Sequence, residues 1–409
     1  MPKLKMTTTK LTLQSAKISR LRARSLAITQ GVLSAVGFSW LLAGSNATTA
    51  LIPLYHTELG FTPLQISLTF GCYVSVLVPI LFLMSRPRLA QWAAISMVTA
   101  MFVAAVAGLA IANANTFGIL GGRALSGVAM GLATGAASAL VVASIGERGR
   151  GISATGNTIG GIVGTLLGQI YVNTYGLEAM SLTYEAHAAI SAMLGGALSL
   201  VLYFRRQANR EILELCRSKS PSSLADHVHL RTQPVLIGCL AWITVSASVV
   251  FMPSLFNSLD MTNTQKSCAL LTLIACAVGQ LASRPMTRFI PWFSGTFAAP
   301  AGMVMVLAGA WCSSDTLALA GFTMAGLGLG ISYRLGLLAC VQNASPAQQA
   351  ALASRYAAVT YLAAFVAVVG TGLIGNCVGL PAAAIGLFAS TAGLFLPLIR
   401  NAPRLSSFA

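Results

Sequence analysis

Two arginines lie inside long apolar stretches of the sequence, where a charged side chain needs a partner. Arg123 stands in GGRALSGVAMGLATG and Arg334 in GISYRLGLLAC. An ionisable group in such a stretch is costly and by default marks a functional site. For each arginine the alternative is a side chain that reaches to the polar edge of its stretch. Arg334 lies roughly 10–12 Å from that edge at Gln342. We expect its planar fork of donors to dock an anionic or electron-rich group of a ligand.

Few other groups could hold a proton or a counter-charge. All nine Asp and Glu residues lie between the apolar stretches or at their ends. Glu185 with His187 is the best-placed pair for binding a proton. Glu147 is expected to neutralise Arg86 or Arg88 at one end of the molecule.

Several kinds of chemistry are disfavoured by what the sequence lacks. The His-x-His at 227–229 has no third metal ligand near it, and no Gly-rich phosphate loop occurs, so we expect no metal, no cofactor and no direct use of ATP. The four His are too few and too peripheral for an enzyme, and the eight Cys are scattered singly. The basic residues sit between apolar stretches and not on one basic face, which excludes nucleic acid as a partner.

Uncharged polar and aromatic side chains are therefore expected to shape most of a binding cavity. Simple packing is the alternative for each of them. With Arg334, such a lining suits an amphipathic organic molecule that is neutral or anionic, because nothing negative would meet a cation. The candidates are Trp40, Asn46, Tyr73, Asn157, Gln169, Trp242, Gln280, Tyr333 and Tyr361.

The composition defines the elements that must position these residues. Apolar residues make up 56% of the chain and charged residues only 8%, whereas a soluble domain carries about 25% charged residues. Apolar stretches of about 20 residues cross a bilayer as helices. We therefore expect an all-α membrane protein. Its twelve spans are placed near 26–46, 65–84, 92–112, 117–142, 152–173, 185–204, 234–256, 267–283, 293–312, 317–341, 356–377 and 381–399.

The basic residues orient these spans, because cytoplasmic loops are enriched in Lys and Arg. With the N-terminus in the cytoplasm, 22 of the 25 Lys and Arg residues fall inside and Lys266 falls outside, while Arg123 and Arg334 lie within spans. We expect both termini to be cytoplasmic and the protein to lie in a bacterial inner membrane.

A short motif occurs twice, half a chain apart. Ser-Arg-Pro stands at 85–87 and again at 283–285, each time where the second span of a set of six ends. Pro ends a helix and Arg favours its C-terminal dipole and the inner leaflet, so one copy alone would be an ordinary helix exit. Two matched copies, each followed by a Trp that opens the next span (Trp92 and Trp292), favour duplicated halves. Arg86 and Arg284 are then equivalent residues at the inner gate.

The longest polar connection lies between the two halves. Duplicated halves are typical of a secondary transporter, with its solute site near mid-membrane between them. The expected parts are a basic tail (1–25), a six-helix bundle (26–204), a linker (205–233), a second six-helix bundle (234–399) and a tail (400–409).

With these features the chain resembles the major facilitator superfamily over essentially its whole length. The loop MSRPRLAQW keeps the Arg and Pro that some members have after the second span. In the fourth span, Arg123, Gly127 and Gly131 match the family's Arg–Gly pattern. The resemblance implies two pseudo-symmetric six-helix bundles and links Arg123 to proton coupling.

The fifth span carries the most informative part of the resemblance. Gly151, Gly160, Gly164 and Gly168 match the glycine spacing of the family's antiporter motif, whereas Thr165 replaces its Pro and Gln169 its last Gly. Glycines every four residues let two helices approach closely in lipid. This face is either ordinary tight packing or a smooth seam along which one bundle slides.

Together, the residues and the resemblance imply a monomeric secondary transporter in the lipid bilayer, and not an enzyme or a solute sensor. The leading hypothesis is export of a small organic molecule, a drug or a secreted metabolite, by antiport against H⁺ or another ion. Export leads because the fifth span resembles the family's antiporter motif. Uptake of a small organic acid by symport or facilitated diffusion is the alternative.

Overall fold

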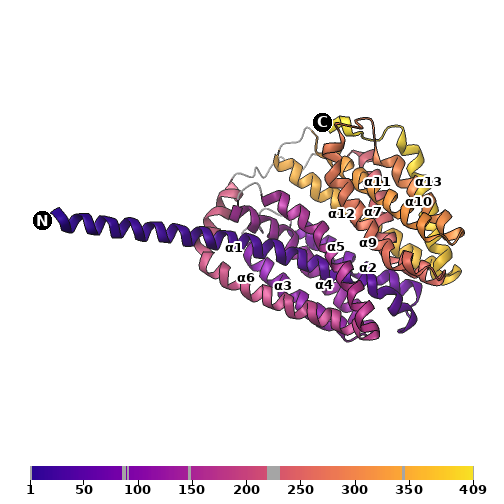
Figure 1. The fold of residues 1–409 in the computed structure, drawn as a ribbon, viewed down its shortest axis with the longest axis horizontal. Helices are drawn as coiled ribbons and strands as arrows, with labels where there is room; N and C mark the ends of the chain where they lie inside the picture. The colour runs from indigo at the N-terminus through magenta and orange to yellow at the C-terminus, as the bar shows by residue number, and fades with distance from the viewer. Residues whose placement is uncertain are drawn as a thin grey trace.

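The computed structural model of the chain consists of long helices that run back and forth between two ends of the molecule (Figure 1). Among the residues that it describes there is no strand. It describes residues 2–84, 89, 92–145, 149–218, 231–342 and 346–408, without the side chains of 2–24, 145–158, 206–218, 346–351, 354 and 407–408. Arg86, Arg88, Glu147 and the side chain of Asn157 therefore lie outside the described part.

Six helices form the first half of the chain. They are α1 (Pro2–Thr57), α2 (Pro63–Met84), α3 (Ala93–Ala112), α4 (Thr116–Ile145), α5 (Gly149–Tyr175) and α6 (Ala179–Ser218). Two of them are longer than the sequence predicts. α1 continues from the expected end at residue 46 to Thr57, and α6 runs to Ser218, so the expected linker begins inside a helix.

Seven helices form the second half and make six spans. They are α7 (Thr232–Val250), α8 (Met252–Ser258), α9 (Thr262–Met286), α10 (Gly295–Trp311), α11 (Asp315–Val341), α12 (Pro346–Val378) and α13 (Leu380–Ile399). α7 and α8 together are the expected seventh span, and they are separated at Phe251. Pro253 explains the break, because it has no N–H to donate to the preceding turn.

The helices are long and apolar enough to cross a membrane. Ten stretches of the described chain satisfy this by length and composition, and one of them, Ile159–Arg205, covers parts of both α5 and α6. α10 is apolar but shorter, with 17 residues. The prediction of an all-α protein with twelve spans is confirmed.

The helices pack as two bundles. In the first, α1 packs on α5, and α4 packs on α2 and α3; in the second, α11 packs on α9 and α10, and α12 packs on α7. Because consecutive spans run in opposite directions, the α1–α2, α8–α9 and α12–α13 connections lie at one end of the molecule, called the distal end. Both termini belong to the opposite end, called the terminal end (Figure 1).

The bundles meet through α2 with α12, α5 with α9, and α1 with α8. Near the distal end, Leu51 and Tyr55 of α1 share one apolar cluster with Met252 and Phe256 of α8. A hydrogen bond from the Leu64 backbone N–H to the side-chain oxygen Asn376 Oδ1 (3.1 Å) also crosses between the bundles there. Packing thus joins the two bundles at the distal end.

The glycine face of α5 packs against α1, within the first bundle. A Cβ on Gly164 would collide with the backbone of Ala43, and one on Gly160 or Gly168 would meet the backbone of Ser39 or Ala47. Because both helices belong to one bundle, these contacts fit the interpretation as tight packing and do not form a seam between bundles.

The C-terminal tail folds back onto the second bundle. Leu405 is buried against Ile331 and Leu335 of α11, and its N–H donates to Phe293 O (3.1 Å). The tail thereby covers the terminal end of α11.

Candidate solute-binding cavity

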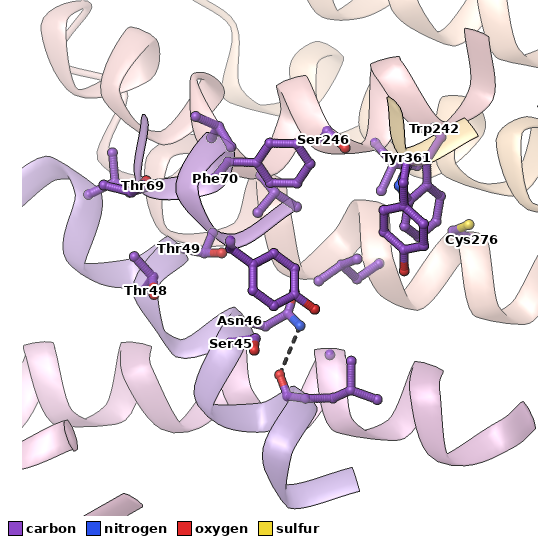
Figure 2. Close-up of a pocket in the computed structure, with 18 of the residues that line it drawn as sticks. Ser45, Asn46, Thr48, Thr49, Thr69, Phe70, Trp242, Ser246, Cys276 and Tyr361 are labelled. Carbon is purple, nitrogen blue, oxygen red and sulfur yellow. Dashed lines mark hydrogen bonds between the residues drawn. The ribbon is translucent and has the colours of Figure 1, made fainter. Parts of the chain in front are cut away.

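A cavity of about 130 Å³ lies between the two bundles, close to the middle of the spans (Figure 2). An apolar cavity of ~150 Å³ holds one benzene molecule, so the space suits a molecule with a single ring. It is lined by Leu42, Ser45, Asn46, Thr48, Thr49, Ile52, Thr69, Phe70, Tyr73, Arg123 and Gly161 of the first bundle, and by Trp242, Val245, Ser246, Val249, Val250, Leu273, Cys276, Ala277, Gln280 and Tyr361 of the second.

The first bundle contributes a polar wall. Ser45, Asn46, Thr48 and Thr49 follow one another on α1, and Thr69 faces them from α2 (Figure 2). Asn46 Nδ2 donates to Leu42 O (2.9 Å) within α1. The sequence prediction missed the hydroxyl-bearing residues after Asn46, because polar residues at this point indicate the end of a span. The apolar residues that follow them, up to Tyr55, are the signal that could have placed them inside the span.

Arg123 of α4 is the charged residue of this wall. Its side chain is only 5% exposed, so it does not reach to the edge of its span. Nε donates to Thr69 O (2.7 Å) and Nη1 donates to Ser45 O (2.8 Å). Cζ lies 4.9 Å from the ring centroid of Tyr73. A guanidinium has five N–H donors, so this arrangement orients Arg123 and leaves donors for a solute.

The second bundle contributes an aromatic wall. Trp242 of α7 and Tyr361 of α12 meet edge to face, with ring centroids 5.0 Å apart (Figure 2). The ring of Tyr333 of α11 packs against Trp242, with ring centroids 5.5 Å apart. Tyr333 itself does not line the cavity. The Trp242 indole Nε1 is buried without a hydrogen-bond partner among the described residues.

Arg334 lies beside the cavity and not on its surface, in contrast to the sequence prediction. Its Nη1 donates to Gln280 O and to Ser283 Oγ (2.6 Å), both on α9. Gln280 does line the cavity. The charge of Arg334 is therefore compensated by a backbone carbonyl and a hydroxyl near the C-terminal end of α9, where helix carbonyls attract a cation.

The expected pair of Glu185 and His187 is not formed. Glu185 is exposed, whereas His187 is buried and stacks on Trp40, with ring centroids 5.4 Å apart. Residues two positions apart on a helix do not face each other, which explains the separation. Trp40 thus packs inside the first bundle and not on the central cavity.

The other candidates lie away from the cavity. Gln169 donates to Asn173 Oδ1 (3.2 Å) on α5, and the side chain of Arg284 is exposed. Of the expected uncharged ligands, the structure brings together Asn46, Tyr73, Trp242, Gln280 and Tyr361. Within the described lining there is one arginine and no carboxylate.

Twelve spans in two bundles, with a solute-sized cavity between them, define a membrane transporter. The family model of the Major Facilitator Superfamily matches residues 32–370, and the chain belongs to this family. It therefore transports small molecules and is not an enzyme. No curated protein matches its sequence.

Solved structures share the fold at low sequence identity. The nucleoside transporter NupG has a TM-score of 0.64 at 14% identity, over 92% of this chain and 99% of its own. A D-xylose-proton symporter has a TM-score of 0.62 at 14% identity, over 93% and 98%. A bacterial homolog of the human lysosomal transporter Spinster has a TM-score of 0.61 at 12% identity, over 92% and 95%. At such identities these likenesses concern the fold alone.

Proposed function

We propose that this transporter moves a small solute with one ring and an electron-rich or anionic group. The observation that carries this proposal is the opposition of Arg123 in the polar wall to Trp242 in the aromatic wall of one cavity. Arg donors bind a carboxylate or a carbonyl, and an aromatic face covers a ring. A cation is disfavoured, because the lining within the described chain offers it no carboxylate.

The mechanism that we propose is alternating access, with the solute held between two bundles that rock around it. Export by antiport against protons is the leading direction, supported by the glycine spacing of α5 that resembles the antiporter motif. Uptake with a proton is the second candidate, and the shared fold with a D-xylose-proton symporter favours it. We place the protein as a monomer in the inner membrane with its terminal end in the cytoplasm.

The solute class is tested with purified protein in detergent. Benzoate, uracil, D-xylose and tetraphenylphosphonium are added separately while thermal unfolding is followed, because a bound solute raises the unfolding midpoint. We expect benzoate or uracil to stabilise the protein and tetraphenylphosphonium to have no effect. Stabilisation by tetraphenylphosphonium alone would contradict the proposed class.

Coupling and direction are tested in proteoliposomes that contain a pH-sensitive dye. Addition of a stabilising solute outside should change the internal pH if protons move with it. Acidification of the lumen indicates symport, and alkalinisation indicates exchange for protons. Solute movement without any pH change would contradict proton coupling.

A further inference from the structure

His187 is a buried basic group that the solute cavity does not use. The structure describes the side chains of two histidines: His56 is exposed at the end of α1, whereas His187 of α6 is only 8% exposed. No described carboxylate accepts a hydrogen bond from it.

The hydrogen bonds of His187 define its tautomer. His187 Nε2 lies 3.1 Å from Trp40 O, and the Trp40 indole Nε1 donates in return to His187 O (3.3 Å). A carbonyl oxygen only accepts, so Nε2 must carry the hydrogen. The basic nitrogen is then Nδ1, and it is buried without a partner in the described part of the chain.

A glycine of α1 makes room for this imidazole. A Cβ on Gly44 of α1 would collide with the ring, so only glycine lets it reach the carbonyl of Trp40. His187 also lines a small cavity of about 10 Å³ with Ser45, Ser126 and Tyr184. Such a volume has room for roughly one water molecule beside the His187 side chain.

The small cavity adjoins the solute cavity. Ser45 lines both of them, and its carbonyl accepts from Arg123. The titratable group that lines the small cavity together with His187 is the hydroxyl of Tyr184 from α6, which bonds to Thr48, whereas Arg123 of α4 lines the solute cavity. α1 contributes the Trp40 ring and α3 contributes Ala104 and Gly108, none of which titrates.

We propose that His187 is a reversible proton-binding site that opens toward the solute cavity at Ser45. Nδ1 takes a proton from hydronium, which leaves as water, and the imidazolium later returns that proton to a water molecule to give hydronium again; no other bond changes. Trp40 O and the stacked indole face stabilise the charged ring, and water accepts from the new Nδ1–H. The assignment of this site to proton coupling rests on the proposed function.

Trp40 reports on this proton directly. In the full chain, Trp92, Trp242, Trp292 and Trp311 are changed to Phe, so that Trp40 alone remains of the five tryptophans. An imidazolium stacked on an indole quenches its fluorescence more strongly than neutral imidazole does. We expect the fluorescence in detergent to fall along a one-proton titration as the pH is lowered from about 8 to about 3.5.

The controls separate this site from its surroundings. His187→Gln keeps a donor for Trp40 O and should abolish the titration, whereas Glu185→Gln, on the exposed face of α6, should leave it unchanged. A flat fluorescence profile, or a titration that survives His187→Gln, would overturn the proposal. The titration needs no solute, so its failure is distinguishable from a failure of proton-coupled transport.

A second variant keeps the test decisive if His187→Gln does not fold. Gly44→Ala pushes the ring away from Trp40 O and should shift the titration midpoint. Gly161→Ala is the matched control, because its Cβ would meet only Asn46, at 3.8 Å, and it should leave the midpoint in place. Equal midpoints in both variants would overturn the proposed site.

Discussion

Arg123 of α4 lies over the ring of Tyr73 of α2, with Cζ 4.9 Å from the ring centroid. The same guanidinium donates to backbone carbonyls of α1 and α2. One side chain thereby ties three helices of the first bundle together and presents its remaining donors to the cavity. A role in holding the bundle and a role in binding the solute must therefore be separated by experiment.

The first prediction concerns Arg123. Arg123→Lys keeps the charge but loses the fork of donors, and a charge-assisted hydrogen bond contributes about 1.5–3 kcal/mol. We expect benzoate binding, measured by calorimetry, to weaken by about 10- to 100-fold. Arg288→Lys, at an exposed position after α9, is the control and should bind normally. Unchanged affinity in Arg123→Lys would remove this arginine from the binding site.

The second prediction concerns the aromatic wall. Trp242→Leu removes a ring whose aromatic contacts contribute about 0.5–1.5 kcal/mol each, so affinity for uracil or benzoate should fall by about 2- to 10-fold. Trp242→Phe keeps a ring and should lose less. Trp311→Leu is the control, since Trp311 at the end of α10 is 90% exposed. If Trp242→Leu and Trp311→Leu bind equally, the solute does not contact this wall.

Much of this architecture is predictable from the sequence. Apolar length and basic loops predict the twelve spans, and an arginine inside an apolar stretch marks a candidate site. The sequence does not show which arginine meets the cavity. Arg123 and Arg334 both stand inside apolar stretches of the sequence. They differ because a carbonyl and a hydroxyl of α9 accept from Arg334, whereas Arg123 donates to carbonyls of α1 and α2.

The polar wall shows why the site was only partly predictable. Thr48 and Thr49 lie beyond the expected end of the first span, and their polarity hides the continuation of α1. The Glu185–His187 pair fails for a different reason, because residues two positions apart lie on different faces of a helix. The partner of His187 is Trp40, 147 residues away in the chain.

The third prediction concerns the packing of α5 on α1. A leucine at Gly164 would collide with the backbone of Ala43, and overpacking costs typically about 1–3 kcal/mol. We expect Gly164→Leu to lower the thermal unfolding midpoint of the purified protein. Gly196→Leu on α6 is the matched control, because a Cβ there meets nothing within 4 Å. Equal midpoints for the two variants would show that α5 does not pack this closely.

The fourth prediction separates Arg334 from the binding site. Arg334→Ala removes the hydrogen bonds that Arg334 donates to Gln280 O and Ser283 Oγ, so we expect a loss of stability of about 1–3 kcal/mol. Benzoate affinity should remain close to that of the unmodified protein. Normal stability with lost affinity would reverse this assignment and place Arg334 on the solute.

The last prediction concerns orientation. Cys312 after α10 and Cys377 near the end of α12 are exposed at the distal end. If the 22 basic residues face the cytoplasm, a membrane-impermeant maleimide added to spheroplasts should label both cysteines. Ser406→Cys at the terminal end, in a chain with Cys312 and Cys377 changed to Ser, should react only after lysis.

The two labelling patterns decide between opposite orientations, because each probe position lies beyond the end of a span or close to it. Reaction of Ser406→Cys in intact spheroplasts would place the basic loops outside, against the charge rule. The distal end, where Leu51 and Phe256 pack the bundles together, would then face the cytoplasm. The expected labelling instead places that packed end outside, so that the cavity would have to exchange its solute through the cytoplasmic side in this conformation.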